Sequence, residues 1–137
     1  MTRIFSKIDP DKLLHMVYFG EEMVSERQEI IAPTNFLQVC SLKMTAGRTF
    51  RPHQHIWKDG PEKVIAQESW CIIKGAVEVS FYDTDGALLE QVIIRVGDIS
   101  VTLEGGHTYT CLEDSVVYEY KTGPYTGIRN DKVFLDG

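Results

Sequence analysis

The sequence has no long apolar run, no cluster of basic residues and only three cysteines. A membrane-spanning helix needs roughly 20 apolar residues in succession, and no segment approaches that length. The net charge of -6 and the lack of a basic run argue against a nucleic-acid partner. Residues 1–7 lack the apolar core of a secretion signal. We therefore expect a cytoplasmic protein that acts on neither nucleic acid nor membrane.

Short β-rich segments make up most of the chain. Residues 77–82 alternate apolar and polar side chains, and residues 116–121 do so again, which is the pattern of a strand with one buried face. Asp85-Gly86 predicts a tight hairpin turn, with residues 88–96 as the returning strand. A chain of 137 residues with many short strands and no long helical pattern predicts one domain built as a β-sandwich or barrel.

The first 35 residues have a different pattern. Asp9 is followed by Pro10, which is the arrangement of a helix N-cap with proline in the first turn. Gly20 marks a further turn. We therefore predict a short helical or turn-like segment ahead of the strands, followed by a strand-like segment over residues 27–31.

Three of the four histidines fall within one spaced pattern. The pattern comprises Gly47, His53, His55, Glu68, Gly75, Gly97, Gly105, Gly106 and His107. Side chains alternate faces along a strand, so His53 and His55 point to one face and Gln54 to the other. Two imidazoles, a carboxylate and a third imidazole on one face suit a divalent first-row metal. The sequence therefore predicts His53, His55, Glu68 and His107 as metal ligands.

This pattern resembles the two metal-binding motifs of the cupins, G-x5-H-x-H-x(3,4)-E-x6-G and G-x5-P-x-G-x2-H-x3-N. The resemblance covers roughly residues 36–121. It implies an all-β double-stranded β-helix, a jelly-roll barrel, over that range. The N-terminal extension is then residues 1–35 and the C-terminal tail residues 122–137, all within a single domain spanning 1–137.

The first motif is interrupted in this chain. Twelve residues, 56–67, separate His55 from Glu68, where the cupin motif has three or four. A longer loop costs little free energy. Glu62 lies in this insertion and stays an alternative carboxylate ligand, although its turn-like surroundings favour Glu68.

The second motif also departs from the cupin pattern. Leu103 stands at its proline position, Cys111 replaces the closing asparagine, and the spacing before His107 is one residue short. Cys111 therefore has two interpretations. It is a reduced core thiol, as we expect for Cys40 and Cys71, or it lies close to the metal.

A set of three imidazoles and one carboxylate suits Fe(II), Mn(II), Ni(II), Co(II) or Zn(II) and leaves room for a substrate. An enzyme also needs a proton-transfer group, and the candidates are Tyr109, Glu119 and Lys121. Five aromatic residues are candidates for a pocket wall or for ordinary sheet packing, namely Trp57, Trp70, Tyr109, Tyr118 and Tyr125. Three cations flank the first histidine pair, as receivers of a carboxylate or phosphate or as a solvated edge, namely Arg48, Arg51 and Lys58.

Residues 51–55 and 118–125 are similar to small single-domain cupins associated with bacterial surface polysaccharide synthesis, including the WbuC-like group. This similarity implies sugar or nucleotide-sugar metabolism. One hypothesis is a metal-dependent isomerase, epimerase or oxygenase acting on a small polar, sugar-derived substrate. The other is a non-catalytic module that binds a sugar-like ligand or senses metal. Small cupins resemble one another in pairing through sheet edges, so we expect a homodimer.

Overall fold

The computed structural model describes residues 1–136 and is almost entirely β-structure. The elements, in chain order, are β1 (Thr2–Phe5), β2 (Leu13–Val17), the 3-10 turn η1 (Gly20–Glu22), β3 (Arg27–Glu29), β4 (Leu37–Met44), β5 (His53–His55), β6 (Trp57–Lys58), β7 (Val64–Ile65), β8 (Glu68–Lys74), β9 (Ala76–Tyr82), β10 (Leu88–Arg95), β11 (Ile99–Thr102), β12 (Gly106–Cys111), β13 (Ser115–Thr122), the 3-10 turn η2 (Ile128–Asn130) and β14 (Lys132–Phe134).

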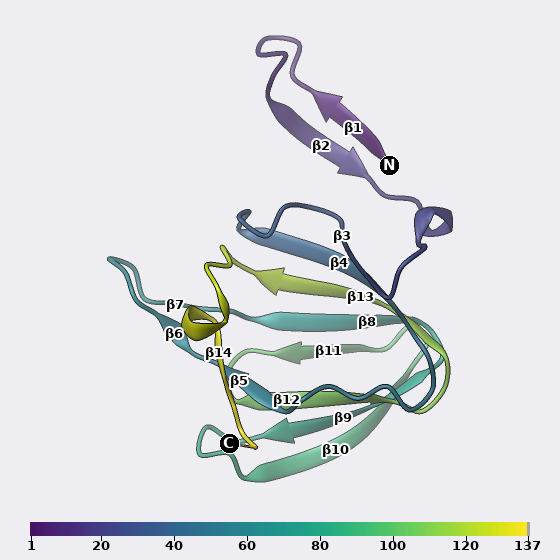
Figure 1. The fold of residues 1–137 in the computed structure, drawn as a ribbon, viewed down its shortest axis with the longest axis vertical. Coiled ribbons are helices and arrows are strands. Elements are labelled where there is room, and N and C mark those ends of the chain that lie inside the picture. The colour runs from purple at the N-terminus through teal and green to yellow at the C-terminus, as the bar shows by residue number, and fades with distance from the viewer. Residues whose placement is uncertain (137) are drawn as a thin grey trace.

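Two five-stranded antiparallel sheets form the body of the molecule (Figure 1). One has the strand order β11-β8-β13-β4-β3 and the other β10-β9-β12-β5-β14. The apolar core contains residues from both sheets: Cys40, Leu42, Met44, Trp70, Ile72, Val77, Val79, Ile94, Tyr109, Cys111 and Val117. This architecture is the predicted jelly-roll double-stranded β-helix.

Along several strands the inward-facing residues change from apolar to polar toward one end of the barrel. In β8 the buried positions run from Ile72 through Trp70 to Glu68. In β12 they run from Cys111 through Tyr109 to His107. Burial of the apolar positions stabilises the barrel by roughly 25 cal/mol per Å² of apolar surface removed from water. The buried polar side chains gather at the other end of the barrel, where they can form a site.

The predicted hairpin at Asp85-Gly86 is confirmed. β9 and β10 pair in antiparallel register, and the Gly86 N–H donates to the carbonyl oxygen of Asp83 at 2.9 Å. Gly86 has a φ of 87°, a left-handed conformation that glycine adopts without steric cost. The turn chemistry read from the sequence therefore fixes this connection.

The N-terminal segment takes the turn rather than the helix of the two predicted alternatives. β1 and β2 form a two-stranded hairpin, which stands apart from the barrel in Figure 1. In its turn the Ser6 hydroxyl accepts hydrogen bonds from the Ile8 and Asp9 amides. A serine that bonds the local backbone in this way stabilises a turn in competition with a helix.

Both sheets extend beyond residues 36–121. The segment predicted as strand-like over 27–31 contributes β3, which pairs with β4 at the edge of its sheet. The C-terminal tail contributes β14, which pairs with β5. This second pairing brings the tail next to the histidine strand.

Across residues 1–136, no helix combines the length and apolarity required to cross a membrane.

Candidate metal centre

The four predicted ligands converge at the polar end of the barrel. One ligand atom from each of His53, His55, Glu68 and His107 lies within 4.8 Å of the other three. Strand pairing explains part of this arrangement, because His107 in β12 lies directly opposite His53 in β5. Ligand bonds of about 2.1 Å place the donor atoms of one metal roughly 3–4 Å apart. The cluster is therefore slightly wider than a single-metal site, and a small inward shift of the side chains would bring its atoms to metal-binding distance.

Hydrogen bonds orient two of the imidazoles for metal binding. Nδ1 of His53 lies 3.0 Å from the carbonyl oxygen of Arg51. Nδ1 of His55 lies 3.3 Å from both the carbonyl oxygen and the carboxylate of Asp131. A histidine that donates through Nδ1 presents the lone pair of Nε2 to a metal. Asp131 therefore has the place of a carboxylate that orients a metal-binding histidine.

Several buried imidazole nitrogens make no hydrogen bond of normal geometry among residues 1–136, although one of them lies near Glu68. These are Nε2 of His53 and both ring nitrogens of His107. Buried polar atoms in proteins are almost always hydrogen-bonded. Imidazole and carboxylate donors suit a divalent transition metal, and such an ion would give Nε2 of His53 and one ring nitrogen of His107 a partner. The residues present therefore fit the metal that the sequence predicts.

The carboxylate of Glu68 joins the histidines. It lies 3.0 Å from Nε2 of His55 and 3.4 Å from Nε2 of His107. Burial favours the neutral acid, but His107 and His55 hold the pKa of Glu68 well below its usual range. For His53, burial and then the charge of Lys132 lower the pKa to about 4. Near pH 7, Glu68 is ionised and His53 is neutral, as metal binding requires.

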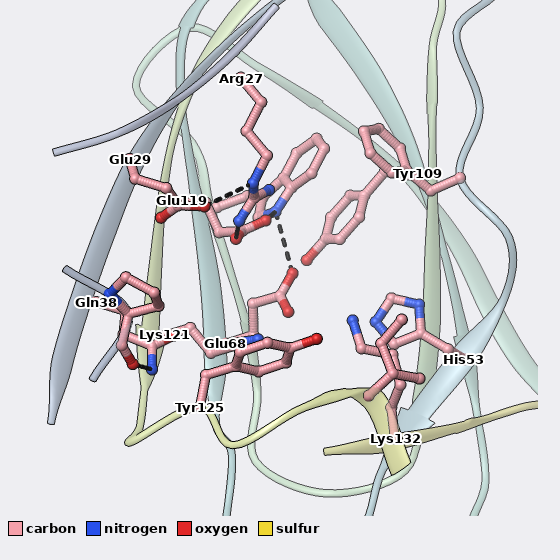
Figure 2. Close-up of a pocket in the computed structure, with 14 residues that line it drawn as sticks. Arg27, Glu29, Gln38, His53, Glu68, Tyr109, Glu119, Lys121, Tyr125 and Lys132 are labelled. Carbon is pink, nitrogen blue, oxygen red and sulfur yellow. Dashed lines mark hydrogen bonds and ion pairs between the residues drawn. The ribbon is translucent and has the colours of Figure 1, made fainter. Parts of the chain in front are cut away.

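A cavity of about 340 Å³ lies beside the ligand cluster (Figure 2). It is lined by Arg27, Glu29, Pro33, Gln38, Phe50, His53, Glu68, Trp70, Tyr109, Glu119, Lys121, Tyr125, Ile128 and Lys132. The structure thus brings the three candidate proton-transfer residues to the same cavity as two of the candidate ligands. Register explains the position of one of them, since Lys121 lies directly opposite Glu68 in the β13–β8 pair.

The three candidate proton-transfer residues differ in their contacts. Tyr109 shares a hydrogen bond of 3.0 Å with the Ser100 hydroxyl, and burial raises the pKa of its phenol. The carboxylate of Glu119 accepts hydrogen bonds from Trp70 at 3.0 Å and Arg27 at 2.9 Å. Lys121 Nζ lies 3.4 Å from Asp131. Of the three, Tyr109 is the least suited to exchanging a proton near neutral pH.

Three of the five aromatic residues considered as a pocket wall line the cavity, and two do not. Trp70 and Tyr125 line the cavity together with Tyr109, and the Trp70 and Tyr109 rings stack with centroids 3.8 Å apart. Trp57 is half exposed, and Tyr118 packs edge-on against Tyr18. Neither Trp57 nor Tyr118 lines this cavity.

The three predicted flanking cations lie outside the cavity lining. Arg48 and Arg51 form ion pairs with Glu26 and Asp136 at exposed positions. Lys58 donates to the carbonyl oxygen of Pro124 at 2.6 Å. The two arginines therefore fit the interpretation as a solvated edge.

The two candidate carboxylate ligands, Glu62 and Glu68, differ in position. Glu62 is exposed in the loop between β6 and β7, whereas Glu68 is buried within the cluster. The twelve-residue insertion, which includes β6 and β7, leaves Glu68 in place.

Cys111 has the place of a core thiol. Its Sγ lies 3.8 Å from Sδ of Met44, and it belongs to the apolar core rather than to the ligand group. Burial raises the pKa of this thiol, which disfavours the thiolate that a metal binds. Cys71 lies half-buried on the opposite face of β8 from Glu68.

Several polar residues of the site were missed in the sequence, among them Arg27, Asp131 and Lys132. Arg27 reaches the cavity from the edge strand β3. Asp131 contacts a histidine 76 positions away, and Lys132 lies opposite His55 in the β14–β5 pair. The only local signal is the alternation of Lys132, Val133 and Phe134, which is too short to specify a strand.

No protein-family model and no curated protein sequence matches this chain. Solved structures do match. KdgF from Halomonas sp. is 22% identical over 70% of this chain and 77% of its own, with a TM-score of 0.54. A double-stranded β-helix protein of Klebsiella pneumoniae is 16% identical over 83% of this chain and 95% of its own, with a TM-score of 0.61.

CapF from Staphylococcus aureus, described as a capsular polysaccharide assembling protein, is 17% identical over 79% of this chain and 31% of its own, with a TM-score of 0.58. A further similar structure is described as an RmlC-like cupin. These similarities show that the fold is the cupin double-stranded β-helix.

Proposed function

We propose that this protein binds one divalent transition metal, Fe, Mn, Ni, Co or Zn, and acts as an enzyme on a small polar substrate in the adjacent cavity. The observation that carries the proposal is the cluster of His53, His55, Glu68 and His107, whose ligand atoms lie within 4.8 Å of one another. Unpartnered imidazole nitrogens and a cavity of about 340 Å³ beside them support it. A cavity of this volume suits a small molecule.

A metal held by these residues would act as a Lewis acid toward an oxygen of the substrate. Lys121 and Glu119 are the residues best placed to give and take a proton, because both line the cavity and burial raises the pKa of the third candidate, Tyr109. Proton transfer of this kind is the central step of an isomerase or epimerase. The proposed reaction is therefore of that type, with an oxygenase as the alternative chemistry.

We propose a sugar-derived substrate and a role in polysaccharide metabolism in the cytoplasm. Two similarities support this substrate class. One is the sequence similarity to cupins associated with surface polysaccharide synthesis, and the other is the structural similarity to CapF. Polar groups gather in the cavity, including Gln38, Glu29 and Lys132, and such groups suit a hydroxyl-rich ligand.

Elemental analysis of the purified protein tests the metal site. About one metal ion per chain is expected, falling at least tenfold in His53→Ala and Glu68→Gln because each substitution removes one of four ligands. Glu62→Gln, which neutralises the exposed carboxylate of the insertion, is the matched control and should retain the metal. Metal content near zero in the parent protein, or equal content in all variants, would contradict the proposal.

The second candidate is a non-catalytic module that binds a sugar-like ligand or senses metal. The contacts of Glu119, Lys121 and Tyr109 favour it, since each polar group is already engaged with a protein partner. Metal-loaded protein incubated with free sugars, nucleotide sugars and oxo acids separates the two candidates. Product formation that is lost in Glu119→Gln would support an enzyme. Binding without product would support the module.

A further inference from the structure

We infer that the ligand of this cavity carries an anionic group, a carboxylate or a phosphate, and that Lys121 and Lys132 bind this group beside the metal. The inference rests on the proposed metal site and deepens it by naming the chemical class of the ligand. It follows from strand register, from the distribution of charge around the cavity and from the contacts of each cation.

Strand register places one lysine beside a candidate ligand in each sheet. Lys121 lies directly opposite Glu68 in the β13–β8 pair, and Lys132 lies directly opposite His55 in the β14–β5 pair. Residues directly opposite one another in antiparallel strands share a face, with Cβ atoms about 4.5–5.5 Å apart. Both lysines line the cavity (Figure 2). The two sheets therefore present one ammonium group each to the space next to the metal.

These ammonium groups share a single carboxylate. Oδ2 of Asp131 lies 3.4 Å from Lys121 Nζ and 3.6 Å from Lys132 Nζ, and Oδ1 lies 3.9 Å from Lys58 Nζ. The same carboxylate also contacts His55. An ammonium group has three donors, so one shared carboxylate leaves donors of Lys121 and Lys132 available to a ligand.

Arg27, the third cation that lines the cavity, forms ion pairs with two carboxylates. The guanidinium of Arg27 lies 3.0 Å from Glu29 and 2.9 Å from Glu119. Its charge is therefore matched by two carboxylates. The surplus of positive charge lies on the side of the cavity that holds Lys121 and Lys132.

The cavity and its border balance in charge before a metal is added. The cations are Arg27, Lys58, Lys121 and Lys132, and the carboxylates are Glu29, Glu68, Glu119 and Asp131. A divalent metal with neutral histidines would leave two positive charges without partners in a partly buried space. Uncompensated buried charge is costly. An anionic group on the ligand would compensate it.

Isothermal titration calorimetry of metal-loaded protein tests the inference with three probes of similar size: glucose, glucuronate and glucose 6-phosphate. At least one of the two anionic probes should bind tenfold or more tightly than glucose, and the better of the two distinguishes a carboxylate from a phosphate. Lys132→Met should abolish this preference at unchanged metal content. Lys132→Arg, which keeps the charge, should retain most of it.

Lys58→Met is the matched control. It removes an ammonium group from the same carboxylate, but Lys58 does not line the cavity, so the preference for the anionic probe should persist. Equal affinity for the three probes, no binding of either anionic probe, or equal losses in the Lys58 and Lys132 variants would overturn the inference. Metal content measured on the same samples reports on the proposed function separately, because metal that binds normally leaves the metal site standing when the anion preference fails.

Discussion

At the scale of single residues, Trp70 links the candidate ligand Glu68 to the rest of the cavity. Its indole N–H lies 3.2 Å from Oε1 of Glu68 and 3.0 Å from Oε2 of Glu119. The ring is buried and stacks on Tyr109. Trp70 thus restricts the orientation of Glu68 without belonging to the ligand cluster.

Trp70→Phe should weaken metal binding about tenfold, since hydrogen bonds that orient ligands typically contribute 10- to 100-fold to metal affinity. The substitution keeps an aromatic ring against Tyr109 and removes the N–H. Metal affinity is measured by competition with a chelator. Trp57→Phe is the control, because Trp57 donates to Glu104 outside the cluster. Equal affinities in the two variants would show that Trp70 does not orient Glu68.

The pH dependence of stability should differ between metal-free and metal-loaded protein. Burial alone would lower the pKa of His55, but its hydrogen bonds with Asp131 and Glu68 raise it above the usual value. A raised pKa gives stability that is present below the unfolded value, about 6.5, and is lost as pH rises through the folded value. Metal binding instead requires neutral histidines, so it strengthens as pH rises through the folded pKa of His55.

We therefore expect the urea midpoint of metal-free protein in chelator to fall as pH rises above about 6.5, the direction that the raised pKa of His55 sets. The added stability that metal confers should grow as pH rises above about 6.5, because metal binding displaces the proton that His55 holds. His55→Asn should remove the fall seen in the metal-free protein. If the urea midpoint of this variant fell with pH as in the parent protein, the loss of stability would come from a group other than His55.

At the scale of elements, the turn before β12 depends on Gly105. Its φ is +86°, and a Cβ atom there would lie 2.5 Å from the carbonyl oxygen of Tyr82. Gly47 has a similar φ of +84° but open space around it. Alanine substitutions at these two glycines therefore separate the effect of backbone strain from the effect of steric overlap.

Gly47→Ala should lower the free energy of unfolding by about 1 kcal/mol, from backbone strain alone. Gly105→Ala should lower it by roughly 3 kcal/mol, because the overlap with Tyr82 adds to a similar strain. Urea unfolding measures both values. Gly105→Ala should also reduce metal content, since β12 carries His107. Similar losses of stability in the two variants would contradict a role for the overlap.

The sequence predicted those elements whose signals are local. The His53-x-His55 alternation, the Asp85-Gly86 turn and the periodicity around β9 each lie within a few residues, and the structure contains all three features. The roles of Asp131 and Lys132 depend on β14 pairing with β5 across most of the chain. No local pattern specifies such a partner, so the position of the tail beside the site could not be predicted from the sequence.

At the scale of the whole molecule, the N-terminal hairpin leaves apolar side chains in contact with solvent. Ile4, Phe5, Leu14 and Phe19 are each about half exposed (45–49%). A two-stranded hairpin alone is marginally stable in water. Tyr18, which follows β2, contacts Gln28 in the edge strand β3, so the exposed hairpin adjoins an edge with unpaired backbone groups.

The homodimer predicted from the sequence stays a prediction, and this surface is where we expect it to form. Sedimentation should give twice the chain mass of 15.6 kDa at micromolar concentration. Ile4→Ser combined with Leu14→Ser should shift the protein toward monomer, because apolar area at the interface is lost. Val24→Ser, at an exposed loop position, should not. A monomer at all concentrations would exclude the dimer.

Because the site is built by strand pairing between distant parts of the chain, we expect the ligand set to be completed late in folding. Of the candidate ligands, only His53 and His55 are neighbours along the chain, and the others arrive through the pairing of β12 with β5 and the closing of β8 against them. An unfolded chain therefore offers two imidazoles and little affinity. An interaction completed after the transition state slows unfolding and leaves the folding rate almost unchanged. In stopped-flow experiments, metal should shift the unfolding limb alone: the ion would determine how long the native barrel lasts rather than how quickly it forms.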